Sequence, residues 1–261
     1  MEAICESVQK IMIEASKFFF ERELYKNQFA KAGDSNFATE VDYIVQQHII
    51  EELARAIPDC NIITEESCEN SYQLDKPTWI LDPVDGTTNL MHQYKHSAIS
   101  LALIVDRKVT LGVIYNPYLK EMFTAIAGQG AYLNKERIHV SDTSSLSSSL
   151  IGFGTTPYKR AEAEKTFRIV KDVFMKSQEV RRSGSGALDI AYVACGRLDG
   201  FFELELQPWD YAAGTIIVQE AGGKISNWNG DGFSMVRSES AIASNTLIHE
   251  ELIQIIHSNP K

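Results

Sequence analysis

The sequence of 261 residues is poor in cysteine and contains no pair with C-x-x-C spacing. Its four cysteines are Cys5, Cys60, Cys68 and Cys195. Four cysteines are too few for a disulfide scaffold, so a reducing compartment fits best and we expect a cytoplasmic protein. The six histidines form no H-x-x-x-H pair. This argues against a zinc site, and we expect the histidines at the surface or at the edge of the core.

Long apolar stretches and an excess of basic residues are missing as well. No apolar run approaches the ~20 residues that a membrane span requires, and the acidic, amphipathic N-terminus lacks the basic and apolar regions of a signal peptide. The 25 basic residues are outnumbered by 35 acidic ones, which gives a formal net charge of −10. This balance argues against nucleic acid or an anionic membrane as a partner. We therefore expect a soluble, unprocessed protein that would need a metal ion to handle an anion.

The hydrophobic content of 44% is enough for a sizeable core in one large domain or two close halves. Helical spacing of apolar residues predicts helices at residues 4–24, 39–57, 161–176, 187–195 and 211–221. Strand patterns predict short strands at residues 61–64, 78–81 and 200–204 and near residue 180, with an antiparallel meander over residues 97–140. We expect an α/β fold of alternating helix and mixed or antiparallel sheet layers. Residues 1–261 would form one catalytic unit, with an internal boundary at the serine-rich residues 141–149.

The most informative segment is residues 79–90, which read W-I-L-D-P-V-D-G-T-T-N-L. An apolar strand is predicted to end at Asp82, because Pro83 prevents it from continuing, and the turn brings Asp85 back beside Asp82. Two such carboxylates repel each other unless a cation shares them, and hard oxygen ligands suit Mg²⁺. Gly86 can open a short helix whose N-terminus seats a phosphate. Taken alone, D-x-x-D-G is also compatible with an ordinary turn.

The extended string resembles the signature of the inositol monophosphatase family. The family's second signature, W-D-x-A-x-G, is present at residues 209–214. Residues 64–67 are similar to its G-E-E-S motif, with Thr64 in place of glycine, and residues 37–42 resemble its V-T-x-x-D segment. Residues 182–189 and 199–203 are similar to the segment that lines its substrate pocket. The resemblance covers nearly the whole chain and implies a sugar-phosphatase-like sandwich, a homodimer and inhibition by Li⁺.

The resemblance also implies roles for individual residues around two or three Mg²⁺ ions. The implied metal ligands are Glu65, Asp82, the backbone carbonyl of Val84, Asp85 and Asp210. Asp82 would bridge two ions, and a water with a lowered pKa would attack phosphorus in line with the leaving group. Glu65 and Thr87 would orient this water or take its proton, so Glu65, Asp82 and Thr87 are the catalytic candidates. No covalent phospho-enzyme is required.

Five positions are expected to bind the substrate: Asp85, Gly86, Thr87, Gly186 and Glu203. Glu203 matches the position where inositol-type members place a carboxylate for sugar hydroxyls, so we expect hydrolysis of myo-inositol monophosphate. Lys31 and Asp42 are expected behind the metal ligands. Asp42 also fits a capping box with Thr39, and a loop lysine such as Lys31 is more often solvated.

Related activities share the implied metal site. They are hydrolysis of fructose 1,6-bisphosphate, of adenosine 3′,5′-bisphosphate and of histidinol phosphate. An alternative of another class is a non-catalytic binding or regulatory protein with the same fold. The sequence argues against it, because all the implied carboxylates and Thr87 are present, whereas a site that has lost its function is expected to lose at least one of them.

Overall fold

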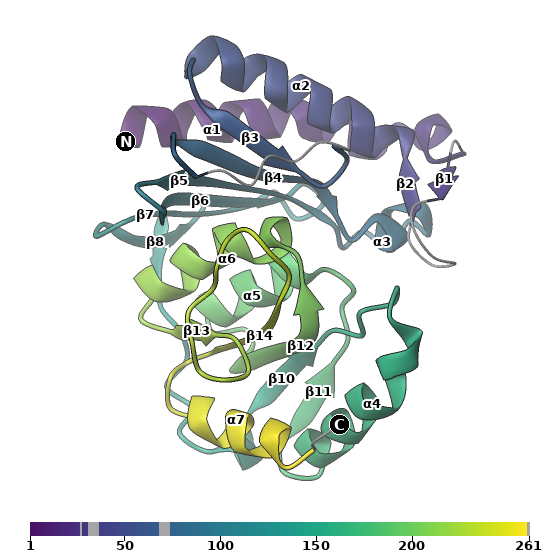
Figure 1. Cartoon of the computed structure of the whole chain (residues 1–261), viewed down its shortest axis with the longest axis vertical. Coiled ribbons are helices and arrows are strands. Elements are labelled where there is room, and N and C mark those ends of the chain that lie inside the picture. Colours follow the sequence, from purple (N-terminus) through teal and green to yellow (C-terminus); the bar gives the residue numbers. More distant parts are fainter. Residues whose placement is uncertain (27, 31–36, 68–73, 260–261) are drawn as a thin grey trace.

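In the computed structural model the described residues are 1–26, 28–30, 37–67 and 74–259. They form alternating layers of helix and sheet (Figure 1). The α-helices are α1 Glu2–Ala15, α2 Glu40–Ala56, α3 Thr87–Met91, α4 Ala163–Phe174, α5 Gly186–Ala194, α6 Pro208–Glu220 and α7 His249–His257. Short 3-10 helices cover Ser16–Phe20, Arg22–Lys26, Leu146–Ser148 and Arg160–Glu162.

A seven-stranded sheet forms the upper sheet layer in Figure 1. Its strands, in spatial order, are β3 Asn61–Thr64, β4 Thr78–Asp85, β5 Ala98–Val105, β6 Lys108–Asn116, β7 Glu121–Ile126, β8 Gly130–Leu133 and β9 Glu136–Ile138. Strand β3 pairs parallel with β4, and all the later pairs are antiparallel. Strands β5 to β9 are the meander predicted for residues 97–140.

Strand β4 of this sheet is buried on both faces, to which its successive side chains point in turn. Trp79 and Leu81 of β4 pack in one core cluster with residues of α1 and α2. Ile80, between them, packs in another cluster with residues of α5 and α6. This arrangement gives strand β4 helical layers above and below it, and all of its residues are buried.

A second, five-stranded sheet lies below α5 and α6. Its strands, in spatial order, are β11 Glu179–Arg181, β10 Leu150–Phe153, β12 Gly200–Leu206, β14 Glu239–Ser244 and β13 Lys224–Ser226. Strand β10 is parallel to both of its neighbours, whereas β14 is antiparallel to β12 and β13. Helices α4 and α7 complete the outer layer through a third core cluster. Strands β1 Gln28–Ala30 and β2 Phe37–Thr39 form a separate antiparallel pair.

Several predicted elements differ from the structure. The first α-helix ends at Ala15 and continues as tighter 3-10 turns, where the prediction had one helix to residue 24. Strands β10, β13 and β14 and helix α7 were not predicted. The three strands are short, whereas α7 has an apolar face of helical spacing that the prediction overlooked. The expectation for the histidines is wrong at His249, which is fully buried between the hydroxyls of Ser226 and Ser244. The serine-rich residues 141–149 lie between β9 and β10 and connect the two sheets.

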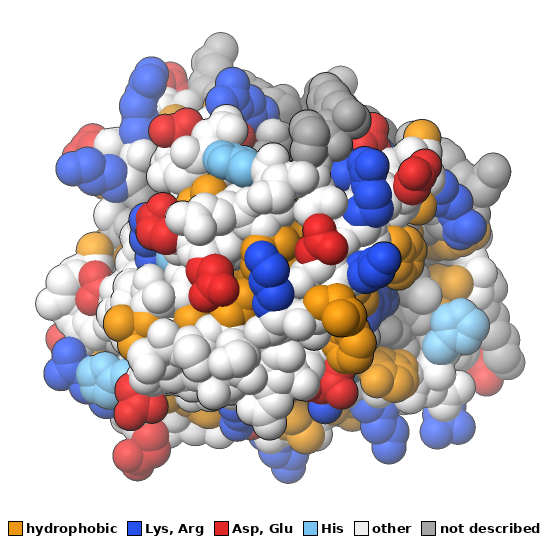
Figure 2. All heavy atoms as spheres, turned by 90° about the horizontal axis from the view of Figure 1, so that it is seen from below, with side chains coloured by type: hydrophobic (Ala, Val, Ile, Leu, Met, Phe, Trp, Pro, Cys, Tyr) orange, Lys and Arg blue, Asp and Glu red, His pale blue; other side chains and the backbone are white. Residues whose placement is uncertain are grey.

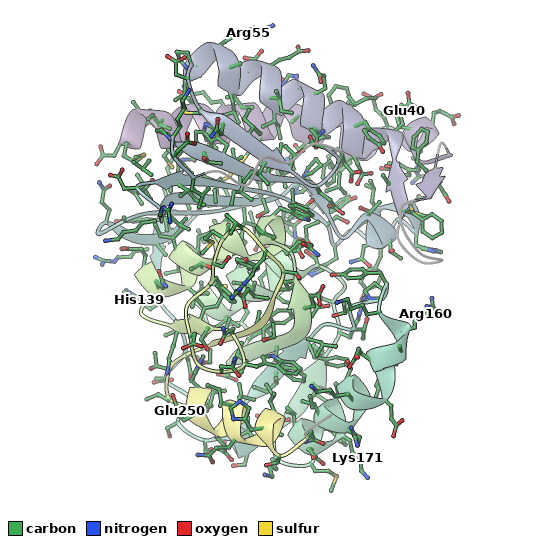
Figure 3. The ribbon with its side chains drawn as sticks, in the orientation of Figure 1. Glu40, Arg55, His139, Arg160, Lys171 and Glu250 are labelled. Atoms are coloured by element: carbon green, nitrogen blue, oxygen red, sulfur yellow. The ribbon has the colours of Figure 1, made fainter. Side chains whose placement is uncertain are left out.

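Many charged side chains lie on the outside of the layers. Arg55, Lys171 and Glu250 are exposed on α2, α4 and α7 (Figure 3). On the face seen from below Figure 1, acidic and basic side chains are interspersed with hydrophobic ones (Figure 2). This face therefore presents no uniform basic surface. Among the described residues, no helix combines the length and the apolar character that crossing a membrane requires.

Candidate functional site

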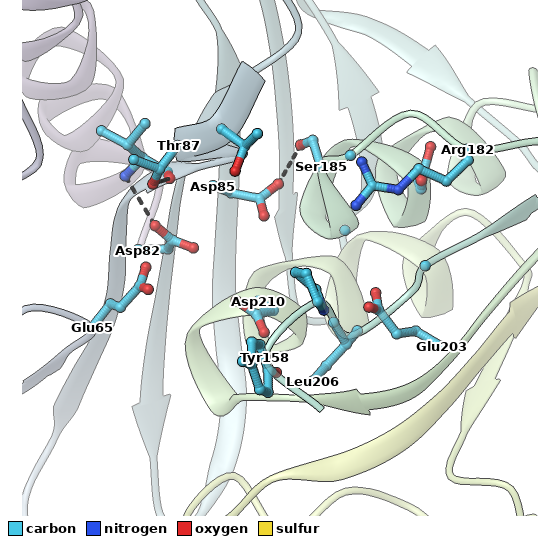
Figure 4. Close-up of a pocket in the computed structure, with 18 of the residues that line it drawn as sticks. Glu65, Asp82, Asp85, Thr87, Tyr158, Arg182, Ser185, Glu203, Leu206 and Asp210 are labelled. Atoms are coloured by element: carbon cyan, nitrogen blue, oxygen red, sulfur yellow. Dashed lines mark hydrogen bonds between the residues drawn. The ribbon is translucent and has the colours of Figure 1, made fainter. Parts of the chain in front are cut away.

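A cavity of about 150 Å³ lies where the end of β4 meets the N-termini of α5 and α6 (Figure 4). Its lining includes the residues for which roles were predicted, apart from Lys31 and Asp42: Glu65, Asp82, Val84, Asp85, Gly86, Thr87, Gly186, Glu203 and Asp210. Asp42 lies directly behind it, and Lys31 falls outside the described residues. The structure therefore gathers side chains from both sheets around one pocket.

A β-bulge places Asp82 and Asp85 together. Asp82 pairs with Ser100 and Asp85 with Ala98, so three steps along β4 match two steps along β5. Residues three apart on a regular strand would point to opposite faces, and the extra residue returns both carboxylates to the same face. The prediction that the strand ends at Asp82 is wrong, because β4 continues through the bulge to Asp85. Pro83 lacks the N–H that an uninterrupted ladder would need.

The turn after the bulge depends on Gly86. Its φ of +86° is in the left-handed region, and a Cβ there would come within 3.1 Å of the Gly184 carbonyl oxygen. Helix α3 starts at the next residue, Thr87. The N–H groups of its first turn have no intrahelical acceptor and lie beside the carboxylates.

Asp82, Asp85 and Asp210 form a group of possible metal ligands, with one carboxylate oxygen from each lying within 4.8 Å of the others. Burial raises the pKa of Asp85 to about 6, and the charge of Glu65 adds to the effect. Burial and the charges of Asp85 and Glu65 raise the pKa of Asp210 well above its usual range. Without a cation these carboxylates resist ionisation. Oxygen donors held this closely fit a hard divalent cation.

The protein holds each carboxylate through separate hydrogen bonds. Oδ1 of Asp82 accepts from the N–H of Val84 at 2.9 Å. Oδ2 of Asp85 accepts from the N–H of Ala187 at 3.0 Å and from the hydroxyl of Ser185, the N-cap residue of α5. Oδ2 of Asp210 accepts from the N–H of Gln207 at 2.7 Å, as part of the capping box of α6. Helix starts thus fix two of the three ligands.

Glu65 follows β3 and points toward Asp82 in Figure 4. On the same side, the hydroxyl of Thr87 lies 3.1 Å from the carbonyl oxygen of Val84 and 2.9 Å from Oδ1 of Asp42. Asp42 is fully buried, and burial raises its pKa to about 6. It also completes the capping box of α2, with Oδ2 accepting from the N–H of Thr39 at 2.7 Å.

The opposite wall of the pocket carries Glu203 on β12. The side chain is 7% exposed, and burial raises its pKa to about 7. Its Oε1 accepts hydrogen bonds from the N–H and the hydroxyl of Thr156, at 2.8 and 3.3 Å. Gly186 begins α5 beside it.

Gly154, Thr156 and Ser185 were not predicted from the sequence as residues of the site. Ser185 had a signal, since a serine directly before an apolar helical segment is a typical N-cap. Gly154 and Thr156 had none, because their importance arises from the pairing of β10 with β12 across the sheet.

Comparisons with known proteins show the family of the chain. A sequence model described as the inositol monophosphatase family matches residues 1–261. The chain is 40% identical over 232 residues to an inositol-1-monophosphatase of Synechocystis, covering 88% of this chain and 79% of the relative. It is 38% identical over 225 residues to the Nus factor SuhB of Escherichia coli K12, covering 86% and 84%.

The fold is also found in solved structures. The IMPase of Thermotoga maritima superposes with a TM-score of 0.88 at 33% identity, covering 99% of this chain and 98% of that one. The suhB protein of Bartonella henselae gives a TM-score of 0.92 at 32% identity, covering 99% and 100%. The predicted layered α/β fold of the sugar-phosphatase type is therefore confirmed.

Proposed function

Because the chain belongs to the inositol monophosphatase family of phosphomonoesterases, we propose that it hydrolyses myo-inositol monophosphate to inositol and phosphate with Mg²⁺ as cofactor. The observation that carries the proposal is the arrangement of two kinds of carboxylate around one cavity. Asp82, Asp85 and Asp210 cluster on one side, and Glu203 stands apart on the other. The first group suits a cation and a phosphate, and Glu203 suits the hydroxyl groups of a polyol.

The donor set fits Mg²⁺. Asp82, Asp85 and Asp210 would hold it, with Glu65 and the Val84 carbonyl as further ligands, for two or three ions in all. When bound, the cations neutralise the substrate phosphate and lower the pKa of a coordinated water. The raised pKa values of Asp85 and Asp210 are compatible with this assignment, since they arise first from burial and then from neighbouring negative charge, and a cation would offset both.

The chain's own groups have distinct tasks in this proposal. The N–H groups at the start of α3 donate to phosphate oxygens. Thr87 orients the attacking water through its hydroxyl, which Asp42 holds in place, and Glu65 accepts the proton. Glu203 accepts hydrogen bonds from the hydroxyls of the leaving alcohol.

Fructose 1,6-bisphosphate, adenosine 3′,5′-bisphosphate and histidinol phosphate are the alternative substrates. Glu203 disfavours a second anionic group near it, because a buried carboxylate repels a phosphate. A purely non-catalytic role is disfavoured because all the predicted carboxylates surround the cavity. Relatives named Nus factor SuhB support a protein partner as a further role beside hydrolysis. We also propose the homodimer that the family resemblance implies.

A phosphate-release assay with Mg²⁺ tests the proposed function. The panel consists of inositol 1-phosphate and the three alternative substrates, each with and without a chelator. We expect the highest kcat/KM for inositol 1-phosphate, complete loss after chelation and inhibition by Li⁺. Full activity after exhaustive chelation would refute the metal assignment, and preference for a bisphosphate would refute the substrate.

A further inference from the structure

Gly154, the residue that follows β10, lies directly against the carboxylate of Glu203. Strands β10 and β12 run parallel with Phe153 opposite Phe202, so the next position on each strand places Gly154 beside Glu203. The N–H of Gly154 donates to the carbonyl oxygen of Phe202 at 3.0 Å, which fixes this alignment. The two residues are therefore neighbours across the sheet, although Glu203 comes 49 positions after Gly154 in the sequence.

The missing side chain of Gly154 makes room for that carboxylate. A Cβ at this position would lie closer than 3.0 Å to both carboxylate oxygens of Glu203, a separation that real Cβ atoms do not show. The backbone conformation does not demand glycine, since the φ of Gly154 is outside the left-handed region. The position of the Glu203 carboxylate thus accounts for glycine at residue 154, because a Cβ there would force that carboxylate to move.

Thr156 fixes the orientation of the same carboxylate. Its φ of +42° is in the left-handed region, which is unfavourable for a β-branched residue. This conformation directs the N–H of Thr156 to Oε1 of Glu203. Within the part of the chain that the structure describes, the hydrogen bonds of the Glu203 side chain all go to Oε1. Oε2 is left to face the cavity that Gly154 and Gly186 also line.

We propose that Gly154 is a specificity-determining positioning residue, which provides the space that holds the Glu203 carboxylate toward the hydroxyls of a polyol leaving group. Strain at Thr156 is consistent with this role, because unfavourable backbone conformations persist where the surrounding structure requires them. The proposal rests on the proposed function, since it takes the leaving group to be a polyol. Gly154 does not touch the reacting atoms and acts through Glu203.

A double-mutant cycle tests the proposal. The variants are Gly154→Ala, Glu203→Ala and the double variant, and the measurement is the ratio of kcat/KM for inositol 1-phosphate to that for p-nitrophenyl phosphate, which has no hydroxyl. Each single variant should lower this ratio by roughly 10- to 100-fold, the loss expected when hydrogen bonds to a charged acceptor disappear. The double variant should show the ratio of Glu203→Ala alone. Gly232→Ala is the control, because a Cβ there meets nothing within 4 Å.

Thermal unfolding supplies a second measurement. If the new methyl group collides with Glu203, Gly154→Ala should lower Tm, and adding Glu203→Ala should restore it. This measurement is informative even if Gly154→Ala alone unfolds under assay conditions. Losses that multiply in the double variant, or a Tm that Glu203→Ala does not restore, would overturn the proposal. A crystal structure of Gly154→Ala with Glu203 still bound to Thr156 would overturn it as well. Absence of turnover by the unmodified enzyme would instead refute the proposed function.

Discussion

The hydroxyl of Thr87 lies 2.9 Å from Oδ1 of Asp42. Asp42 belongs to helix α2, which starts 47 residues before Thr87 in the sequence. The other oxygen of Asp42 accepts from the N–H and the hydroxyl of Thr39. One buried carboxylate thus caps α2 and orients the residue that opens α3. The geometry of the pocket is coupled in this way to the helix that covers the far side of the sheet.

Asp42→Asn should lower kcat by roughly 10- to 100-fold, because the amide no longer presents a charged acceptor to Thr87. Thr39→Val is the matched control, since it weakens the cap of α2 but leaves the contact of Asp42 with Thr87. That variant should lose ~1 kcal/mol of stability with little change in kcat. Steady-state kinetics and urea unfolding measure both. Equal loss of kcat in the two variants would assign the effect to the helix cap.

Asp85→Asn should fold but lose turnover, because the amide removes a negative charge from the metal-ligand group. Mg²⁺ should stabilise the wild-type protein by about 2.7 kcal/mol at 100 times its Kd, and this gain should largely vanish in the variant. Tm with and without Mg²⁺ reports the difference. Asp106→Asn, at an exposed turn, should retain both turnover and the Mg²⁺ effect. Normal kcat in Asp85→Asn at ordinary Mg²⁺ would contradict the ligand assignment.

The buried Glu203 should make stability depend on pH. Its pKa of about 7 in the folded protein exceeds the ordinary value of 4.5, so its stabilising contribution is full below pH 4.5 and is lost as the pH rises through 7. Glu203→Gln should therefore gain stability over wild type between pH 5 and pH 8, by at most roughly 3 kcal/mol. Urea unfolding in chelator at both pH values measures the gain.

Ser185→Ala should weaken Mg²⁺ binding as well as the fold. The variant loses the N-cap hydroxyl of α5, at a cost of ~1 kcal/mol, and one donor to Asp85. Groups that hold metal ligands typically contribute 10- to 100-fold in affinity, so the Mg²⁺ concentration for half-maximal activity should rise by ~10-fold. Ser183→Ala is the control, because Ser183 donates to Asp189 instead. An unchanged Mg²⁺ requirement in Ser185→Ala would show that the N–H of Ala187 is sufficient.

Local patterns in the sequence predicted which residues form the site better than they predicted how these residues are arranged. The acidic string around Asp82 and Asp85 predicted that the two carboxylates meet, because both lie within one short segment. The same string predicted a turn where the structure has a bulge, since pairing with β5 decides between the two. Gly154 shows the larger limit. Gly154 and Glu203 become neighbours because β10 pairs with β12, which is distant in the sequence, and no local periodicity encodes which strands pair.

The division of the pocket between early and late parts of the chain has a consequence for synthesis. Asp85 accepts a hydrogen bond from the N–H of Ala187, which the ribosome adds 102 residues later, and Asp210 follows later still. A nascent chain that has completed β4 to β9 therefore carries both Asp82 and Asp85 but lacks Ser185 and Ala187, the two residues that hold the Asp85 carboxylate. Under the proposed metal assignment, the full set of ligands for Mg²⁺ is present only after Asp210 of α6 has left the ribosome. Premature termination within residues 141–149 would release a fragment in which the face of the sheet that α5 and α6 cover is exposed. Chaperones and proteases would act on such a fragment.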